Sequence, residues 1–267
     1  MSKKKNTNIV WLKRDLRLTD HLPLYHAIQK QENFLILYIY EPSLMRDVHY
    51  DERHWRFIEQ SLTDIQEELQ VYDKKLTVTH GEVAEVFELL LDKYCIKNIF
   101  SHEETGLKIT YSRDTQLNLL FKKNYIIWNE YPSNAVIRGL TNRKNWEKHW
   151  NDVMRDDIER INLLKAKIIN HDFCPKNLPT FTSKKFYQKG GFKSAHIELK
   201  SFFTDRGIEY SKNISKPEKS RYTCSRLSPY ISYGNISIRE IYKVLLNSWN
   251  KPGWRRSMKA FSSRLHW

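Results

Sequence analysis

The first half of the chain alternates between short apolar runs and longer amphipathic segments. The apolar runs are almost continuous, which is typical of strands buried on both faces of a parallel sheet. They lie at Asn8–Leu12, Phe34–Tyr40, Leu76–His80, Ile96–Phe100 and Ile126–Trp128. Between them, Trp55–Leu69 and Val83–Tyr94 place apolar residues three or four positions apart, as amphipathic helices do. The pattern predicts an α/β domain over residues 1–135 with a doubly wound, five-stranded parallel sheet.

Beyond residue 135 the periodicity is helical. Residues 142–169 carry apolar residues at helical spacing, which predicts a long helix inside a connecting segment, 136–190. The later part of this segment, His171–Lys185, has two prolines and little periodicity, as linkers between domains do. Residues 191–267 show helical periodicity only, which predicts an all-α domain. Because nothing in Gly253–Trp267 signals the end of a helix, we expect this domain to be incomplete.

The composition indicates a globular protein that does not span a membrane. The chain has 267 residues, of which 40% are hydrophobic, enough for a packed core. No apolar run approaches the roughly 18 residues that a membrane span needs. Three cysteines, Cys95, Cys174 and Cys224, lie far apart without a C-x-x-C pair, which argues against a disulfide framework or a metal site. We expect each to be a small, partly buried side chain in a protein of the reducing cytoplasm.

Positive charge is concentrated in the last third of the chain. The formal net charge is +14, and residues 172–267 hold 19 Lys and Arg against 6 Asp and Glu, a net of +13. Such a field attracts polyanions, either nucleic acid or the phosphates of a cofactor. A basic surface that serves solubility, or one whose acidic partner lies elsewhere, remains the alternative.

The segment Tyr210–Ser237 is the strongest candidate for a phosphate site. The sequence has neither G-x-G-x-x-G nor a P-loop, so a standard dinucleotide site is not indicated. Ser225 is expected to cap a short helix over Arg226–Tyr233, which Gly234 would stop. Free backbone N–H groups, nearby hydroxyls and the Arg226 guanidinium would then converge on a phosphate or pyrophosphate, with Tyr210 facing the same space. An ordinary capped helix with a solvated arginine is the alternative.

Several stretches resemble the DNA photolyase/cryptochrome family. The opening IVWLKRDLRLTDHLPL keeps the pattern W-x-[KR]-x-D-L-R-x-x-D-[NH]-x-x-L, and SHEETGLKITYSRD resembles the family's fourth strand and following helix. GGFKSAHIELKSFF and TCSRLSPYISYGNISIRE resemble the start of its helical flavin domain, and FSSRLHW resembles a helix of the flavin and lesion pocket. The matches follow the family's order over essentially the whole chain. The resemblance implies a Rossmann-like α/β domain followed by the beginning of an FAD-binding domain.

The resemblance also implies site residues, while leaving the catalytic groups unknown and implying no metal. The expected contacts with FAD are Tyr210, Cys224, Ser225, Arg226, Leu227, Ser228 and Phe261. Arg264 and Trp267 fall where the family contacts damaged DNA. Arg264 stands where many photolyases carry a glutamate that touches the flipped pyrimidines, which moves some weight toward a photoreceptor.

The identity of a second, antenna chromophore is open. The Asn-Glu pair that holds a folate in some members falls on Ile109 and Thr110, which cannot supply its hydrogen bonds. A deazaflavin, a lumazine or no antenna remains possible. Arg14, Asp15 and Arg17 are interpreted as an ion-pair network that ties the first turn to the domain interface rather than as site residues.

The leading hypothesis is a deoxyribodipyrimidine photolyase, a carbon–carbon lyase in which excited reduced FAD passes an electron to a flipped-out pyrimidine dimer in DNA. The alternatives are a cryptochrome-like blue-light photoreceptor without repair activity, and a nucleotide-binding α/β module with an unrelated helical appendage. We expect a cytoplasmic monomer. Because the flavin domain is expected to be incomplete, we expect residues 1–267 alone to bind FAD weakly and to be inactive.

Overall fold

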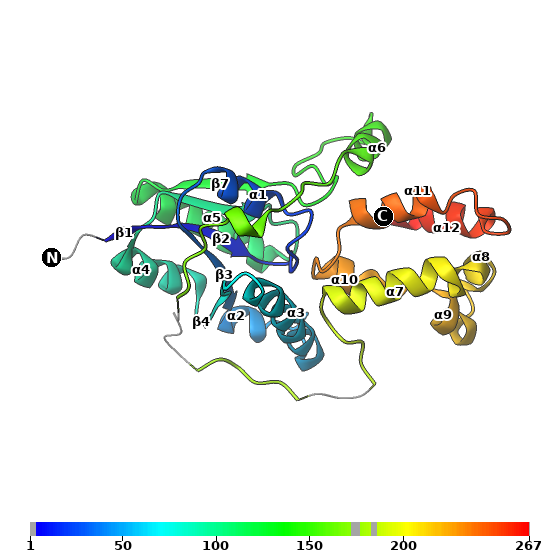
Figure 1. Cartoon of the computed structure of the whole chain (residues 1–267), viewed down its shortest axis with the longest axis horizontal. Helices are drawn as coiled ribbons and strands as arrows, with labels where there is room; N and C mark the ends of the chain where they lie inside the picture. Colours follow the sequence, from blue (N-terminus) through cyan, green and yellow to red (C-terminus); the bar gives the residue numbers. More distant parts are fainter. Residues whose placement is uncertain (1–3, 172–176, 183–185, 267) are drawn as a thin grey trace.

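A parallel sheet forms one half of the molecule and a group of helices forms the other (Figure 1). The structure, a computed structural model, describes residues 4–171, 177–182 and 186–266. The main sheet has five parallel strands in the order β4-β3-β2-β6-β7. They are β2 (Asn8–Leu12), β3 (Phe34–Tyr40), β4 (Thr77–His80), β6 (Asn98–His102) and β7 (Ile127–Tyr131). The predicted α/β fold is confirmed, with β2 and β3 at their predicted bounds.

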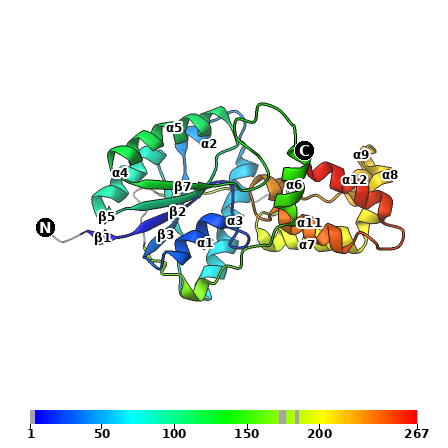
Figure 2. The same cartoon turned by 90° about the horizontal axis from the view of Figure 1, so that it is seen from above.

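Helices cover both faces of this sheet, as Figure 2 shows from above. The described helices of this half are α1 (Leu22–Gln29), α2 (Pro42–Met45), α3 (Glu52–Gln70), α4 (Val83–Lys93) and α5 (Lys108–Lys123). Successive side chains of β2 enter opposite cores, because a strand alternates its faces. Val10 packs in the core that includes α1 and α3, whereas Trp11 packs edge-on against Phe87 of α4 with ring centroids 5.5 Å apart. The sheet is therefore doubly wound.

A second, two-stranded parallel sheet pairs β1 (Lys5–Asn6) with β5 (Tyr94–Cys95). The side chain of Tyr94 is buried, whereas Cys95 is exposed. The expectation that Cys95 is partly buried is therefore wrong, because the alternation of this short strand turns it outward. Cys224 is half-buried and free, and Cys174 lies outside the described residues. No helix in the described ranges is long and apolar enough to cross a membrane.

Over its described residues, the connecting segment has little regular secondary structure. Its helix α6 is confined to Trp146–Arg155, and a single 3-10 turn, η1, follows at Leu163–Lys165. Ile168 then forms an isolated parallel bridge with Phe34, whose N–H and C=O bond to the linker at 3.1 and 2.9 Å. The prediction of one long helix over residues 142–169 is wrong. The physical reason is that β4 pairs with β3 only from Leu37 onward, so the start of β3 leaves backbone groups that the linker satisfies.

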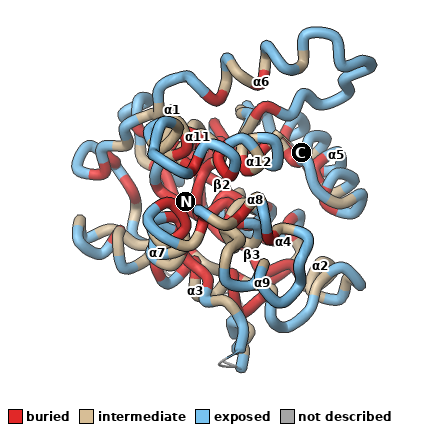
Figure 3. Tube along the Cα trace, turned by 90° about the vertical axis from the view of Figure 1, so that its right-hand side faces the viewer, coloured by how far each residue is buried: buried red, intermediate tan, exposed pale blue. Residues whose placement is uncertain are grey.

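The second half of the molecule is helical over its described residues. Its elements are α7 (Phe192–Thr204), η2 (Arg206–Glu209), α8 (Tyr210–Asn213), α9 (Pro217–Thr223), α10 (Ser228–Ser232), α11 (Ile238–Asn247) and α12 (Arg255–Leu265). In Figure 1, α7 runs alongside α11 and α12, and α10 lies where this group meets the sheet. In Figure 3 the buried stretches gather around β2 and β3, and most exposed stretches lie at the rim.

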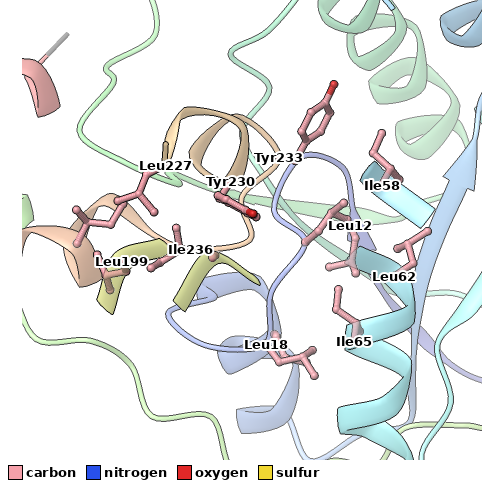
Figure 4. Close-up of a cluster of buried hydrophobic side chains, with 14 of the residues drawn as sticks. Leu12, Leu18, Ile58, Leu62, Ile65, Leu199, Leu227, Tyr230, Tyr233 and Ile236 are labelled. Carbon is pink, nitrogen blue, oxygen red and sulfur yellow. The ribbon is translucent and has the colours of Figure 1, made fainter. Parts of the chain in front are cut away.

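One hydrophobic core continues from the sheet into the helices (Figure 4). Leu12 of β2 and Ile58 of α3 lie on one side of this cluster, Tyr230 and Ile236 lie on the other, and Tyr233 lies between them. Each of these five residues is at most 9% exposed. The α10 segment is therefore fixed against the sheet by burial of apolar surface.

Candidate functional site

The segment before α10 turns through a left-handed residue. Arg226 has φ of +59°, a region that costs a non-glycine residue about 1–2 kcal/mol. The helix begins at Ser228, after Leu227 as its cap residue, and the Ser225 hydroxyl accepts only a 3.4 Å bond from Leu227 N–H. The prediction that Ser225 caps a helix over Arg226–Tyr233 is wrong, because a left-handed Arg226 cannot belong to a right-handed helix.

Three successive carbonyl groups of this loop are bound by side chains. Arg206 donates to the carbonyl oxygens of Cys224 and Ser225, the latter at 3.0 Å. Gln188 Nε2 donates to the carbonyl oxygen of Arg226 at 2.8 Å. The N–H groups of Ser225 and Arg226 have no hydrogen-bond partner among the described residues. The N–H of Ser228, the first residue of α10, also lacks one. The loop of residues 224–228, called the SR loop below, thus keeps free amide donors at Ser225, Arg226 and Ser228 next to a guanidinium.

The side chains of the SR loop differ in their exposure. The Arg226 guanidinium is 32% exposed and lies 4.0 Å from Glu198 of α7, a weak ion pair. Leu227 is buried at 1% exposure, whereas Ser228 is exposed. Cys224 is half-buried, and burial raises the pKa of its thiol. Arg226 and Ser228 are therefore the side chains of this loop that a ligand can reach most easily.

Tyr210 and Phe261 lie in the helical core rather than beside Arg226. Both are buried, and Tyr210 meets the rings of Phe202 and Phe261 edge-on at 5.5 and 5.7 Å. Burial raises the pKa of the Tyr210 hydroxyl to about 12. The expectation that Tyr210 and Arg226 face one open space is wrong, because the aromatic packing takes the tyrosine ring inward. Arg264 is exposed on α12, and Trp267 lies outside the described residues.

The carboxyl edge of the sheet holds a buried cluster that includes Asp15, His21 and His102. Asp15 Oδ2 lies 2.6 Å from His102 Nδ1 and 2.9 Å from His21 Nε2. Burial alone would raise the pKa of Asp15, but the two histidine hydrogen bonds hold it well below its usual range. Burial lowers the pKa of His102 to about 3, so its ring is neutral at physiological pH.

The donor atoms of this cluster lie within 4.8 Å of one another, close enough to consider a metal ion. However, His21 Nδ1 accepts a 3.1 Å hydrogen bond from the N–H of Leu24, so the proton of the neutral ring sits on Nε2. Metal ligation through Nε2 would require an imidazolate. We therefore interpret the cluster as a buried polar network around Asp15, with a hydrogen bond to His102 and a close approach of His21 Nε2, which agrees with the sequence interpretation of Asp15 as structural.

Arg17 ties this first turn to the helical half. Its guanidinium is buried and donates to the carbonyl oxygens of Thr19, Asp20 and Gly234 at 2.8–3.2 Å. Arg14 lies 3.5 Å from Glu104. The interpretation of Arg14, Asp15 and Arg17 as a network at the domain interface is thus consistent with these contacts.

Several cavities lie at the same edge of the sheet, and two of them are lined by residues at or just after the end of β2. One of about 180 Å³ is lined by Lys13, Arg14, His102 and Ser232, among others. The second, of about 30 Å³, lies beside Trp11 and the buried ion pair between Arg113 and Glu41, and is much smaller than the several hundred Å³ of a typical ligand pocket. Ile109 is exposed, and the Thr110 hydroxyl donates to the Leu107 carbonyl at 2.8 Å, so neither presents an amide or a carboxylate.

A sequence model of one family matches this chain, and the match decides its membership. The DNA photolyase model covers residues 8–147, from the first strand of the main sheet into α6. The chain belongs to the DNA photolyase family.

Curated relatives match the helical half of the photolyase-family chain as well as its α/β half. A cryptochrome DASH of Synechocystis is 33% identical, with 89% of this chain and 54% of the relative covered. A cryptochrome DASH of Idiomarina loihiensis is 23% identical, with 96% of this chain and 60% of the relative covered. A deoxyribodipyrimidine photo-lyase of Buchnera aphidicola is 24% identical, with 91% and 54% covered. The chain spans between half and three fifths of the length of these relatives.

Solved structures share the fold of the photolyase-family chain over its whole length. A cryptochrome of Synechocystis superposes with a TM-score of 0.79 at 19% identity, covering 100% of this chain and 60% of the other. A class III photolyase of Agrobacterium tumefaciens gives 0.75 at 17% identity, covering 100% and 58%. The helical half is therefore part of the family fold and not an unrelated appendage.

The sequence patterns do not point to the residues that hold the SR loop from behind. Arg206 and Gln188 lie 18 and 38 residues from the carbonyls that they bind, and neither belongs to a motif. The sequence could have pointed to His102, because it is a polar residue at the carboxyl end of a buried strand, where α/β proteins place functional groups.

Proposed function

We propose that this chain supplies the α/β domain and the flavin-phosphate loop of a deoxyribodipyrimidine photolyase-like flavoprotein, which repairs pyrimidine dimers in DNA with light. The observation that carries the proposal is the SR loop. Within a stretch that resembles the family's phosphate turn, the free amides of Ser225 and Arg226 lie beside a partly exposed guanidinium. Converging N–H donors and an arginine are the groups that bind a pyrophosphate.

Each residue of the SR loop would make a different contact with the phosphates of FAD. The two amides would donate to the phosphate oxygens, and Arg226 would exchange its weak 4.0 Å contact with Glu198 for a charge-assisted bond to the ligand. The Ser228 hydroxyl, which is exposed, would add a further donor. Leu227, Tyr210 and Phe261 would act through packing, and Cys224 through its backbone. When bound, reduced FAD would supply the electron that opens the dimer.

DNA containing pyrimidine dimers is the proposed partner. The net charge of +13 on residues 172–267 supports contact with phosphates, and Arg264 is exposed on α12. Arg264 and Trp267 are proposed to contact the lesion. We also propose a monomer of the cytoplasm, with domains at 1–135, 136–190 and 191–267, and leave the antenna open between a deazaflavin, a lumazine and none.

A blue-light photoreceptor without repair activity is the second candidate. Arg264 favours the photoreceptor, because it stands where the family resemblance places a glutamate in many photolyases. An arginine cannot accept hydrogen bonds from pyrimidine N–H groups. Relatives named cryptochrome DASH add weight to this candidate.

Amide chemical shifts test the flavin part of the proposal, since NMR detects even weak binding. FAD titrated into the ¹⁵N-labelled chain should shift the amide signals of Ser225, Arg226 and Ser228 most strongly, with residues of the sheet unaffected. Shifts scattered over the surface, or none, would refute the phosphate loop.

Light-dependent repair separates the two candidate functions. The chain is co-purified with the remaining helical segment of the Synechocystis relative, loaded with reduced FAD and irradiated with blue light in the presence of a thymine-dimer oligonucleotide. Loss of the dimer supports repair. A preparation that holds FAD and leaves the dimer intact supports the photoreceptor instead.

A further inference from the structure

Arg206 binds two carbonyl groups of the SR loop and also residues of α7. It lies in η2, directly after α7, and its side chain is 16% exposed. Besides the carbonyls of Cys224 and Ser225, it donates from Nε to the Ser201 hydroxyl at 2.9 Å and from Nη2 to the Glu198 carbonyl at 3.0 Å. It also pairs with the Glu198 carboxylate. One guanidinium thus joins the last turns of α7 to the backbone of the loop.

This contact fixes the direction of the loop's amide groups. In a planar trans peptide, the C=O of one residue and the N–H of the next point in opposite directions, and the described chain has no cis peptide. Because Arg206 binds the carbonyls of Cys224 and Ser225, the N–H groups of Ser225 and Arg226 point away from it. Both of these amides lack a partner among the described residues. Gln188 holds the next peptide in the same way.

The left-handed Arg226 shows that the loop needs such support. An arginine at φ of +59° is strained and persists only where its surroundings determine it. Without donors behind the loop, the peptides on either side of Ser225 could rotate and turn their N–H groups inward.

We propose that Arg206 is the positioning residue of the SR loop: it binds the carbonyls of Cys224 and Ser225 so that the two amides are held ready for a pyrophosphate. This inference rests on the proposed flavin-phosphate function of the loop. Arg206 does not itself touch the ligand. It lowers the cost of binding because the loop is already ordered in the binding geometry.

Inorganic pyrophosphate is the probe, and its affinity is measured from the amide shifts of Ser225 and Arg226 in the full chain. Arg206→Met removes all donors and keeps most of the apolar stem, and we expect at least tenfold weaker binding. Arg206→Lys keeps the charge and can reach one carbonyl, so it should recover part of the affinity. Arg256→Met, at an exposed position of α12 outside the loop, makes the same charge change and should leave the affinity within twofold of wild type.

The pyrophosphate affinity of each variant is corrected for the fraction of protein that is folded. This correction separates a positioning role of Arg206 from an effect of Arg206 on the stability of the fold. If Arg206 only stabilises the fold, folded Arg206→Met binds pyrophosphate as tightly as wild type, and that result overturns the inference. If wild type itself shows no shifts at Ser225 and Arg226, the phosphate function fails instead. Recovery by Arg206→Lys equal to wild type would mean that charge alone matters, which also contradicts positioning through two carbonyls.

Discussion

The guanidinium of Arg17 donates a 3.1 Å hydrogen bond to the carbonyl oxygen of Gly234, which lies 217 residues further along the chain. Next to it, the N–H of Leu16 bonds to the Tyr233 carbonyl at 3.0 Å, and the Asn235 amide returns a bond of 3.0 Å to the Leu16 carbonyl. The first turn of the α/β half therefore holds the backbone just after α10. Since the SR loop leads into α10 and shares Ser228 with it, its position depends on this junction.

Gly234→Ala tests how tightly the junction is packed. Gly234 has φ of +69°, and a β-carbon there would lie 2.3 Å from the Arg14 carbonyl oxygen. We expect a loss of about 3 kcal/mol in the free energy of unfolding, from backbone strain together with the clash. Gly139→Ala is the control, because Gly139 has a similar φ of +72° but nothing within 4 Å of its β-carbon. It should cost only about 1 kcal/mol. Equal costs in denaturant melts would show that the backbone approach at Gly234 is unimportant.

The buried pair of Arg113 and Glu41 should be sensitive to pH. Burial raises the pKa of Glu41 to about 7, against the attraction of Arg113. Folding therefore favours the protonated carboxyl, and stability from this group falls as pH rises from its usual pKa toward 7. Arg113→Met removes the cation, so the destabilisation should be about 3 kcal/mol at pH 8 and clearly smaller at pH 5. In a Glu41→Gln background the pH dependence of this cost should disappear. A cost independent of pH in both backgrounds would rule out this coupling.

His196 and Glu240 link α7 to α11 by a 2.6 Å hydrogen bond. The bond to Glu240 raises the pKa of His196 above its usual value. The stabilisation is therefore complete below the usual pKa and is lost as pH rises through the raised one. We expect wild type to exceed His196→Gln in melting temperature at pH 5.5 and this advantage to shrink by pH 8.5. The effect should be modest, because the imidazole is 45% exposed. With Glu240→Gln already present, His196→Gln should show no such trend.

The continuous apolar runs of the sequence were sufficient to predict the sheet. The geometry of the candidate site depends instead on tertiary contacts that no local sequence pattern encodes. β2 and β3 are continuous apolar runs covered on both faces, so their bounds follow from the residues alone. At the left-handed turn of Arg226, Arg206 and Gln188 bind the loop carbonyls from distant positions, and the ring of Tyr210 packs inward against Phe202 and Phe261. Local propensity at Ser225 favours a cap, and these tertiary contacts override it.

The central claim is that the SR loop binds the pyrophosphate of FAD through Arg226. The most direct measurement compares the FAD affinity of wild type, Arg226→Ala and Arg255→Ala. Arg255 is exposed on α12, with its guanidinium 4.5 Å from the Trp249 ring, and lies in no motif. We predict that Arg226→Ala weakens FAD binding by about 1.5–3 kcal/mol, the range for a hydrogen bond to a charged group, and that Arg255→Ala changes it little. Equal FAD affinity in the two variants would contradict the account, because Arg226 would then contribute no specific contact to the cofactor.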